Sequence, residues 1–68
     1  MDLYRCFLEK DENTPIGWQS IRCPNDAAAR RKAMRMLTER SEVQRIEVWR
    51  GADLAVRVNR NSLQLRAD

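Results

Sequence analysis

Residues 24–40 read PNDAAARRKAMRMLTER and carry the only strong helix signal in this 68-residue chain. Proline disfavours the helical region for the residue before it, and Asn25 or Asp26 can accept hydrogen bonds from the first free amides of a helix. At 100° per residue the apolar side chains form one stripe, made of Ala29, Ala33, Met36 and Leu37 with Met34 at its edge. The stretch therefore predicts an amphipathic helix that ends near Arg40 and covers one face of a sheet.

A strand and a polar connection precede this helix. Residues 3–9, LYRCFLE, are rich in aromatic and apolar side chains, which is typical of a strand. Successive side chains of a strand point to opposite faces, so the continuous apolar set predicts that Tyr4, Cys6 and Leu8 point inward. Residues 10–15, KDENTP, have the composition of a turn.

Residues 16–22, IGWQSIR, are predicted to form the return strand of a first hairpin. The inward face of this strand stays open between two registers. One register buries Ile16 and Trp18, and the other buries Ile21 and Cys23.

Residues 43–50 and 54–58 predict a second hairpin, because apolar and polar side chains alternate in both segments. A two-residue loop, Gly51-Ala52, would place Ile46 opposite Arg57 and would mix core and solvent faces. A three-residue loop, residues 51–53, keeps the faces separate; its pairs are Val48 with Val56, Ile46 with Val58, and Glu47 with Arg57. We therefore expect the three-residue loop.

These segments predict an α+β fold of ββαββ order, with a four-stranded, mainly antiparallel sheet and one helix packed on one face. We expect a single domain over residues 1–68, with an ordered core at about 2–59 and residues 60–68 as a tail or a short edge strand. The strand order is left open. The uncovered face of the sheet should carry Arg5, Phe7, Arg45, Glu47, Trp49 and Arg57.

The composition is that of an ordinary globular domain, with 43% hydrophobic and 34% charged residues. A chain this short buries only about 60% of the surface that its unfolded form exposes, so a partner that adds buried area would stabilise it. Size alone therefore makes homodimerisation a candidate.

Charge is distributed unevenly along the chain. Residues 1–29 have a net charge of −2 and residues 30–68 a net charge of +5, which together give +3. Eleven of the thirteen basic residues are Arg. Bidentate contacts with phosphate or carboxylate groups would explain this bias, and so would a GC-rich genome that favours Arg codons.

Apolar runs in the chain are shorter than the roughly 18 residues that a membrane span needs. The first residues also lack a basic segment followed by an apolar one. We therefore expect a cytoplasmic protein. In the predicted hairpin Cys6 lies opposite Trp18 or Gln19 while Cys23 lies near the open end, so the two thiols are expected to be too far apart for a disulfide.

Catalytic chemistry finds little support in the sequence. The chain has no His, so the usual general base near neutral pH is missing, and two cysteines without His make a poor metal site. Gly17 and Gly51 are isolated, which excludes a glycine-rich phosphate loop. Asp11 and Glu12 are adjacent in a turn and are expected to be solvated. We expect no enzymatic activity, no metal and no cofactor.

The predicted helix carries four basic side chains, Arg30, Arg31, Lys32 and Arg35. Basic residues early in a helix oppose its dipole, and Arg31 and Arg35 repel each other at i,i+4. The four residues form either a solvated outer face or a surface for nucleic acid or an acidic partner.

Trp49 is expected on the strand face opposite Ile46 and Val48, beside Arg45 and Arg57. An exposed Trp of this kind can anchor a dimer interface or stack on a nucleic-acid base. It can also simply pack on its neighbours or under the C-terminal segment.

Three pieces of the chain carry a family resemblance: residues 4–8 (YRCFL), 26–33 (DAAARRKA) and 45–51 (RIEVWRG). From Tyr4 to Val58 the chain resembles a family of small uncharacterised proteobacterial proteins with an aromatic first strand, an acidic turn, an Ala-rich helix and a closing hairpin. The turn here, residues 11–13 (DEN), departs from the acidic-Gly turn of that family. The resemblance implies the same fold and a bacterial origin, and it implies no activity.

These observations together predict a small cytoplasmic, non-enzymatic binding or adaptor module of bacterial or phage origin. It is expected to act through protein–protein contacts as a homodimer. The alternative is a nucleic-acid-binding accessory protein that uses the basic helix face and Trp49. The candidate binding residues are Arg30, Arg31, Lys32, Arg35, Arg45, Trp49 and Arg57.

Overall fold

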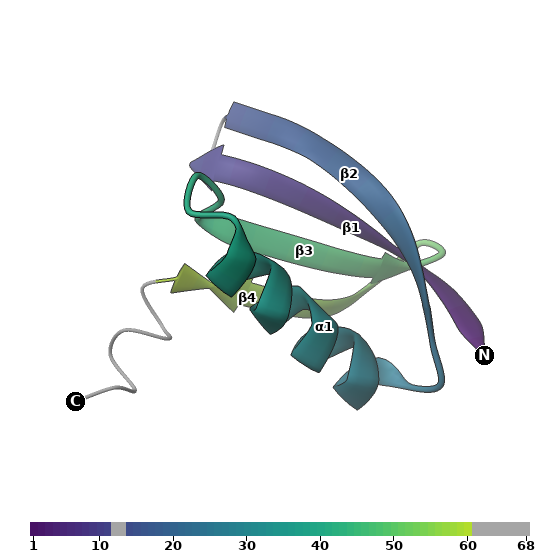
Figure 1. Cartoon of the computed structure of the whole chain (residues 1–68). Coiled ribbons are helices and arrows are strands. Elements are labelled where there is room, and N and C mark those ends of the chain that lie inside the picture. Colours follow the sequence, from purple (N-terminus) through teal and green to yellow (C-terminus); the bar gives the residue numbers. More distant parts are fainter. Residues whose placement is uncertain (12–13, 61–68) are drawn as a thin grey trace.

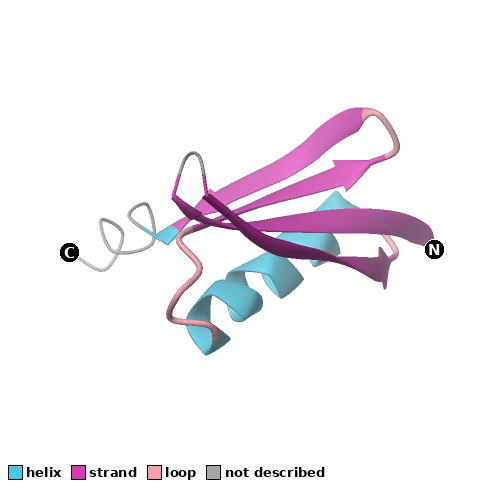
Figure 2. Cartoon of the chain, turned by 90° about the horizontal axis from the view of Figure 1, so that it is seen from above, coloured by secondary structure: helices cyan, strands magenta, loops and turns pink. Residues whose placement is uncertain are grey.

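The predicted elements are all present in the computed structural model, which describes residues 1–11 and 14–60. They are β1 (Asp2–Asp11), β2 (Thr14–Cys23), α1 (Asp26–Glu39), β3 (Arg45–Arg50) and β4 (Asp53–Asn59). The strands form one antiparallel sheet in the order β2-β1-β3-β4, and α1 lies on one face of it (Figure 1, Figure 2). The chain therefore has the predicted α+β, ββαββ architecture.

The helix joins two strands that are not neighbours in the sheet. β2 and β3 lie on either side of β1, and both run antiparallel to it, so they are parallel to each other. The chain must cross over β1 to pass from one to the other, and α1 forms this crossover (Figure 1). Because the chain crosses the sheet only once, the helix covers only one face.

The helix begins and ends as its sequence predicts. Asn25 is the N-cap: its backbone is extended, with φ −162°, and its side-chain oxygen accepts a hydrogen bond from the amide of Ala28 at 2.9 Å. Arg40 is the C-cap. The predicted stripe is buried, and its members are Ala29, Ala33, Met36 and Leu37. Met34 lies at its edge and packs against the core while partly exposed.

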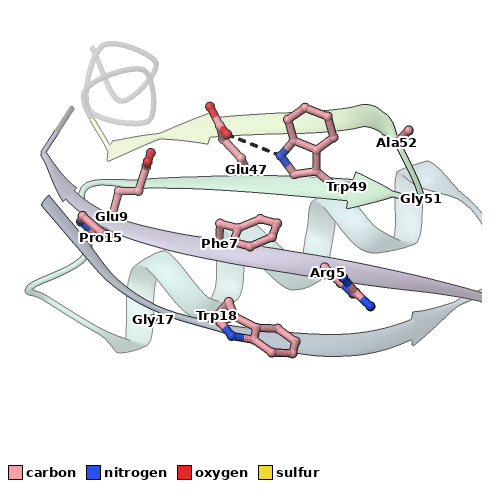
Figure 3. A pocket seen from close by; sticks show the side chains of 10 residues that line it. All are labelled: Arg5, Phe7, Glu9, Pro15, Gly17, Trp18, Glu47, Trp49, Gly51 and Ala52. Atoms are coloured by element: carbon pink, nitrogen blue, oxygen red, sulfur yellow. Dashed lines mark hydrogen bonds between the residues drawn. The ribbon is translucent and has the colours of Figure 1, made fainter. Parts of the chain in front are cut away.

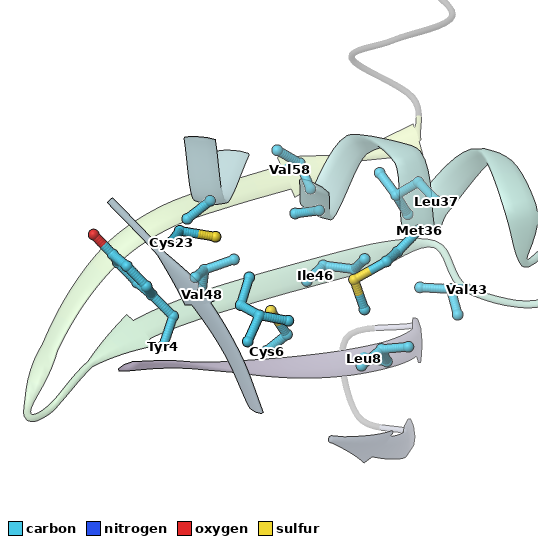
Figure 4. Close-up of a cluster of buried hydrophobic side chains, with 13 residues drawn as sticks. Tyr4, Cys6, Leu8, Cys23, Met36, Leu37, Val43, Ile46, Val48 and Val58 are labelled. Atoms are coloured by element: carbon cyan, nitrogen blue, oxygen red, sulfur yellow. The ribbon is translucent and has the colours of Figure 1, made fainter. Parts of the chain in front are cut away.

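The core lies between α1 and the inner face of the sheet (Figure 4). Tyr4, Cys6 and Leu8 of β1 all point into it, as predicted. The open question about β2 is resolved in favour of the second register: Ile21 and Cys23 are buried, whereas Trp18 is 60% exposed. Both cysteines are buried and free, and Cys6 pairs with Gln19 in the sheet, which agrees with the prediction of two separate thiols.

The first hairpin is longer than predicted. β1 continues to Asp11 and β2 starts at Thr14, so part of the predicted connection over residues 10–15 belongs to the strands. Backbone pairing continues past the apolar side chains because two register shifts, after Leu8 and after Glu9, absorb the mismatch. Pro15 is tolerated because β2 is an edge strand. The rest of the predicted connection, residues 12–13, lies outside the described residues.

The second hairpin has the predicted register and a different loop. Ile46 pairs with Val58 and Glu47 with Arg57, as expected. The expected three-residue loop is wrong: Arg50 pairs with Asp53 across a two-residue loop, and a register shift follows between Val48 and Trp49. Gly51 makes the tighter turn possible because its φ of +62° is accessible to glycine.

Two groups distant in sequence hold the start of α1. The Tyr4 hydroxyl donates a hydrogen bond to Asp26 Oδ1 at 2.6 Å, and Arg50 approaches the same oxygen at 3.3 Å. The hydrogen bond to Asp26 raises the pKa of Tyr4 above its ordinary value, with burial adding to the effect. Asp26 therefore connects the first turn of the helix to β1 and β3.

Arg60 holds the other end of the helix. Its guanidinium donates to the carbonyl oxygens of Leu37, of Arg40 at 2.8 Å and of Val43 at 2.8 Å. The last turn of α1 contains no basic residue of its own, so Arg60 supplies the positive charge that a helix C-terminus favours. Sequence analysis assigned Arg60 to the C-terminal tail; the remainder of that tail, residues 61–68, lies outside the described residues.

Replacing Arg60 tests this cap. Arg60→Ala should lower the free energy of unfolding by about 1–3 kcal/mol, because the substitution leaves several partly buried carbonyls without their charged donor. Arg60→Lys should recover only part of the loss, since an ammonium group cannot reproduce the planar fork of donors. Urea unfolding followed by circular dichroism measures the difference. Arg31→Ala on the exposed side of α1 is the control and should cost less than about 0.5 kcal/mol.

Candidate functional site

The sheet face without the helix is built from the side chains that alternate with the core. We call it the open face; it consists of Arg5, Phe7 and Glu9 of β1, Trp18 of β2, Arg45, Glu47 and Trp49 of β3, and Arg57 of β4. The members that sequence analysis predicted for this face are all present. Trp18 and Glu9 were not among them.

Three aromatic rings gather on the open face, one from each of three neighbouring strands. Phe7 stands between Trp18 and Trp49, because β1 lies between β2 and β3 (Figure 3). The ring centroids of Phe7 and Trp18 are 6.4 Å apart with the planes tilted by 35°. The guanidinium of Arg5 lies over the Trp18 ring, 5.7 Å from its centroid. We call Phe7, Trp18 and Trp49 the aromatic cluster.

Ion pairs occupy the remainder of the open face. Glu9 accepts a hydrogen bond from Nε of Arg45 at 2.6 Å, and the Glu47 carboxylate lies 3.1 Å from the Arg57 guanidinium. Glu47 also accepts a long hydrogen bond of 3.4 Å from the indole nitrogen of Trp49. The two candidate binding residues Arg45 and Arg57 are therefore each matched by a carboxylate of the same face.

The aromatic cluster borders a shallow hollow of about 570 Å³ on the open face (Figure 3). Glu9 and Glu47 also line it, and Arg5 lines it near Trp18. Contiguous exposed apolar patches are uncommon on the surfaces of monomeric proteins, and interaction sites are one class of surface where they are found. Trp and Arg are also the residues that anchor protein interfaces.

The apolar surface continues beyond the hollow. Leu3 alternates with Arg5 along β1, and Leu54 pairs with Trp49, so both residues lie on the same side of the sheet as the cluster. Their side chains are 46% and 40% exposed. The exposed apolar area therefore extends across all four strands.

The basic residues of the helix lie on the other side of the molecule. Arg31 and Arg35 are opposite the buried stripe of α1 and point away from the sheet. Lys32 lies toward β2, where it borders a hollow with Arg22, and Arg30 lies toward β4, where it borders another with Arg57. The predicted binding residues thus fall on two opposite faces, and only Arg30 and Arg57 meet, around the edge of β4.

Sequence reasoning missed Trp18 because the hydrophobic pattern of β2 fits two registers equally well. The signal that selects the exposed position comes from β1: Phe7 pairs with Trp18, and Phe7 alternates with Cys6 and Leu8, which point inward. Side chains of directly paired residues share a face. Once the pairing of β1 with β2 is known, Trp18 must therefore lie on the open face.

The described residues include no cluster of metal-ligating side chains, and the Cys6 thiol among them is buried. Among residues 1–11 and 14–60, no group of three or more Cys, Asp or Glu side chains could hold a metal ion. Burial raises the pKa of the Cys6 thiol to about 11, the charge of Cys23 adds to the rise, and Lys32 opposes it. Within the described ranges, no helix is long and apolar enough to cross a membrane.

No protein-family model, curated protein or solved structure matches this chain. The resemblance to small proteobacterial proteins therefore stays a prediction, and so does the cytoplasmic location. The open face, with its exposed aromatic cluster, is the feature of the chain from which a function can be inferred.

The Cys6 thiol gives a test of pH dependence. Because its pKa in the folded state lies above that of an unfolded thiol, folding favours the protonated form, and stability should fall as pH rises from about 9 toward 11. At pH 8 the native protein should react with a thiol reagent far more slowly than the urea-unfolded protein. A disulfide reagent that releases a coloured thiolate when it reacts with a cysteine allows both rates to be followed by absorbance. Fast reaction of the native protein that disappears in Cys6→Ser would contradict this burial.

Proposed function

We propose that this protein is a small non-enzymatic binding module that acts through protein–protein contacts, with the open face as its contact surface and homodimerisation as its mode of association. The observation that carries the proposal is the aromatic cluster. Trp18 and Phe7 are 60% and 37% exposed on a sheet face that has no covering element in the described chain. The solvated face of an antiparallel sheet commonly carries polar side chains, and the cross-strand contact of Phe7 with Trp18 leaves most of the indole exposed.

The charges of the open face support a protein partner over nucleic acid. Two carboxylates, Glu9 and Glu47, border the same hollow as the indoles, and they would lie close to the phosphates of a bound strand. Proteins that bind single strands combine stacking rings with a positively charged groove. Here the stacking rings and the basic helix residues lie on opposite faces of the sheet.

Nucleic-acid binding is kept as the second candidate because of one contact. Arg5 lies over the exposed ring of Trp18, and an aromatic ring with a guanidinium beside it is a platform on which a base can stack. This form of the alternative uses the open face alone, without Arg31 or Arg35.

Removing the exposed indole tests the main proposal. The wild-type protein should self-associate reversibly as its concentration rises, and Trp18→Ala should weaken this association by about 30-fold or more, the loss typical of an interface anchor. Sedimentation velocity over a concentration series measures both. Arg35→Ala on the outer side of α1 is the matched control and should associate like the wild type. Equal association of Trp18→Ala and wild type would exclude the open face.

Titration with labelled single-stranded DNA and RNA at two salt concentrations separates the two candidates. If the main proposal is correct, neither nucleic acid should bind in a saturable way, even at low salt. Binding that weakens steeply with salt, and that is lost in Arg5→Ala, would favour the second candidate, because phosphate contacts release counterions. Lys10→Ala serves as the control for a general loss of positive charge.

A further inference from the structure

The open-face residues of β1 run from a positive charge, through an aromatic ring, to a negative charge. Read in the opposite direction, the strand presents the opposite charge at each end. Arg5, Phe7 and Glu9 alternate along the strand, so a cation and a carboxylate lie on either side of a central ring. Alternate residues of a strand are about 7 Å apart, which places the Cα atoms of Arg5 and Glu9 each about 7 Å from the Cα atom of Phe7. A strand with this order is complementary to a copy of itself that runs in the opposite direction.

We propose that the occupant of the open face is a second copy of this chain, packed face to face with the two β1 strands antiparallel, so that Arg5 meets the partner's Glu9. This inference rests on the proposed function and adds the arrangement of the dimer. Such an interface is isologous: every contact occurs twice, related by a two-fold axis.

The pairing of the strands determines where this axis lies. Trp18, Phe7, Glu47 and Arg57 are paired in sequence across the sheet and form one row. An axis parallel to that row exchanges the positions on either side of it, which brings Arg5 over the partner's Glu9. An axis parallel to the strands and passing over β1 would instead bring Arg5 over the partner's Arg5. Of the two axes that pass over β1, its charges therefore select the first.

The same axis places complementary groups on β3. Trp49 pairs with Arg5 and lies on one side of the row, while Arg45 pairs with Glu9 and lies on the other. The reversal brings the Trp49 ring opposite the partner's Arg45, a favourable contact between a cation and a ring. The aromatic side chains of the central row meet their own copies.

Two like-charge approaches accompany this arrangement, because Glu47 and Arg57 both lie in the central row and each faces its own copy. The two side chains pair within each chain at 3.1 Å, so each chain presents a compensated pair to the other. The aligned packing of twisted sheets, with strands crossing at about 30°, also moves side chains away from the axis. The reciprocal contacts of Arg5 with Glu9 are therefore the charge contacts that decide the arrangement.

The size of the open face fits a weak and reversible dimer. Strands of six to ten residues, spaced about 4.8 Å apart, give a face of roughly 20 Å by 20–30 Å. Two such faces bury on the order of 1,000 Å², which is the lower limit for a specific interface.

Charge reversal with complementation tests the arrangement. Arg5→Glu and Glu9→Arg should each lose self-association by at least about tenfold, because like charges then meet across the interface. An equimolar mixture of the two variants should form a heterodimer, since both reciprocal contacts become opposite in sign. Sedimentation velocity of each variant and of the mixture measures this. Arg35→Glu, on the outer side of α1, is the control: alone it should associate like the wild type. Mixed with either variant, it should bind that variant more weakly than the complementary variant does, because only one of the two reciprocal contacts is then opposite in sign.

Glu9→Arg places two cations side by side within the chain, because Glu9 pairs with Arg45. Neutral variants test the same contact without this repulsion. Arg5→Gln and Glu9→Gln should each weaken the dimer, and the double variant should be no weaker than either single one, because the two residues share one contact. Additive losses, or a mixture that stays monomeric, overturn the antiparallel arrangement. If Trp18→Ala still abolishes association in that case, the proposed function stands. A wild-type protein that remains monomeric excludes the second copy as the occupant.

Discussion

A single crossover determines the organisation of this molecule. The chain passes from β2 to β3 over β1 through one helix, so one face of the four-stranded sheet receives the helix and the other receives none of the described elements. The buried side chains of the strands therefore belong to one face, as Tyr4 and Ile46 illustrate. The opposite face is built from the alternate residues, whose identity is not constrained by the core. Of the aromatic rings found there, Phe7 and Trp18 pack on one another across neighbouring strands and are otherwise left exposed.

The charged side chains of the open face are largely paired with one another. Two ion pairs, between Glu9 and Arg45 and between Glu47 and Arg57, leave the centre of the face close to neutral. Pairs at a surface contribute little to stability, and half of the Arg57 side chain is exposed. Their effect is that the carboxylates of the open face are compensated within the chain.

The helix is held at both ends by side chains that are far away in the sequence. Tyr4 and Arg50 meet Asp26 in the first turn, and Arg60 donates to the carbonyl of Leu37 in the last. The acidic group lies at the positive end of the helix dipole and the basic group at the negative end, which is the favourable order. The helix provides its own acidic group in Asp26, whereas its last turn has no basic residue, so Arg60 supplies the positive charge that this end lacks.

The sequence alone determined the features that depend on local periodicity. The buried stripe of α1 follows from the 100° repeat, and the pairing of Val48 with Val56 follows from two short alternating strands that only one register can match. The ββαββ order follows because each strand and the helix can be recognised from its own stretch of sequence. These features involve residues close in the chain, where few arrangements compete.

Only the tertiary structure decided which surface the functional candidates share. The exposed position of Trp18 depends on its pairing with Phe7, and the helix cap at Leu37 depends on Arg60, a residue 23 positions away. The separation of Arg31 from Trp49 depends on which face the crossover covers. Periodicity assigns each residue to a side of its own strand or helix; the contacts between elements determine which of those sides meet, and that information is not local.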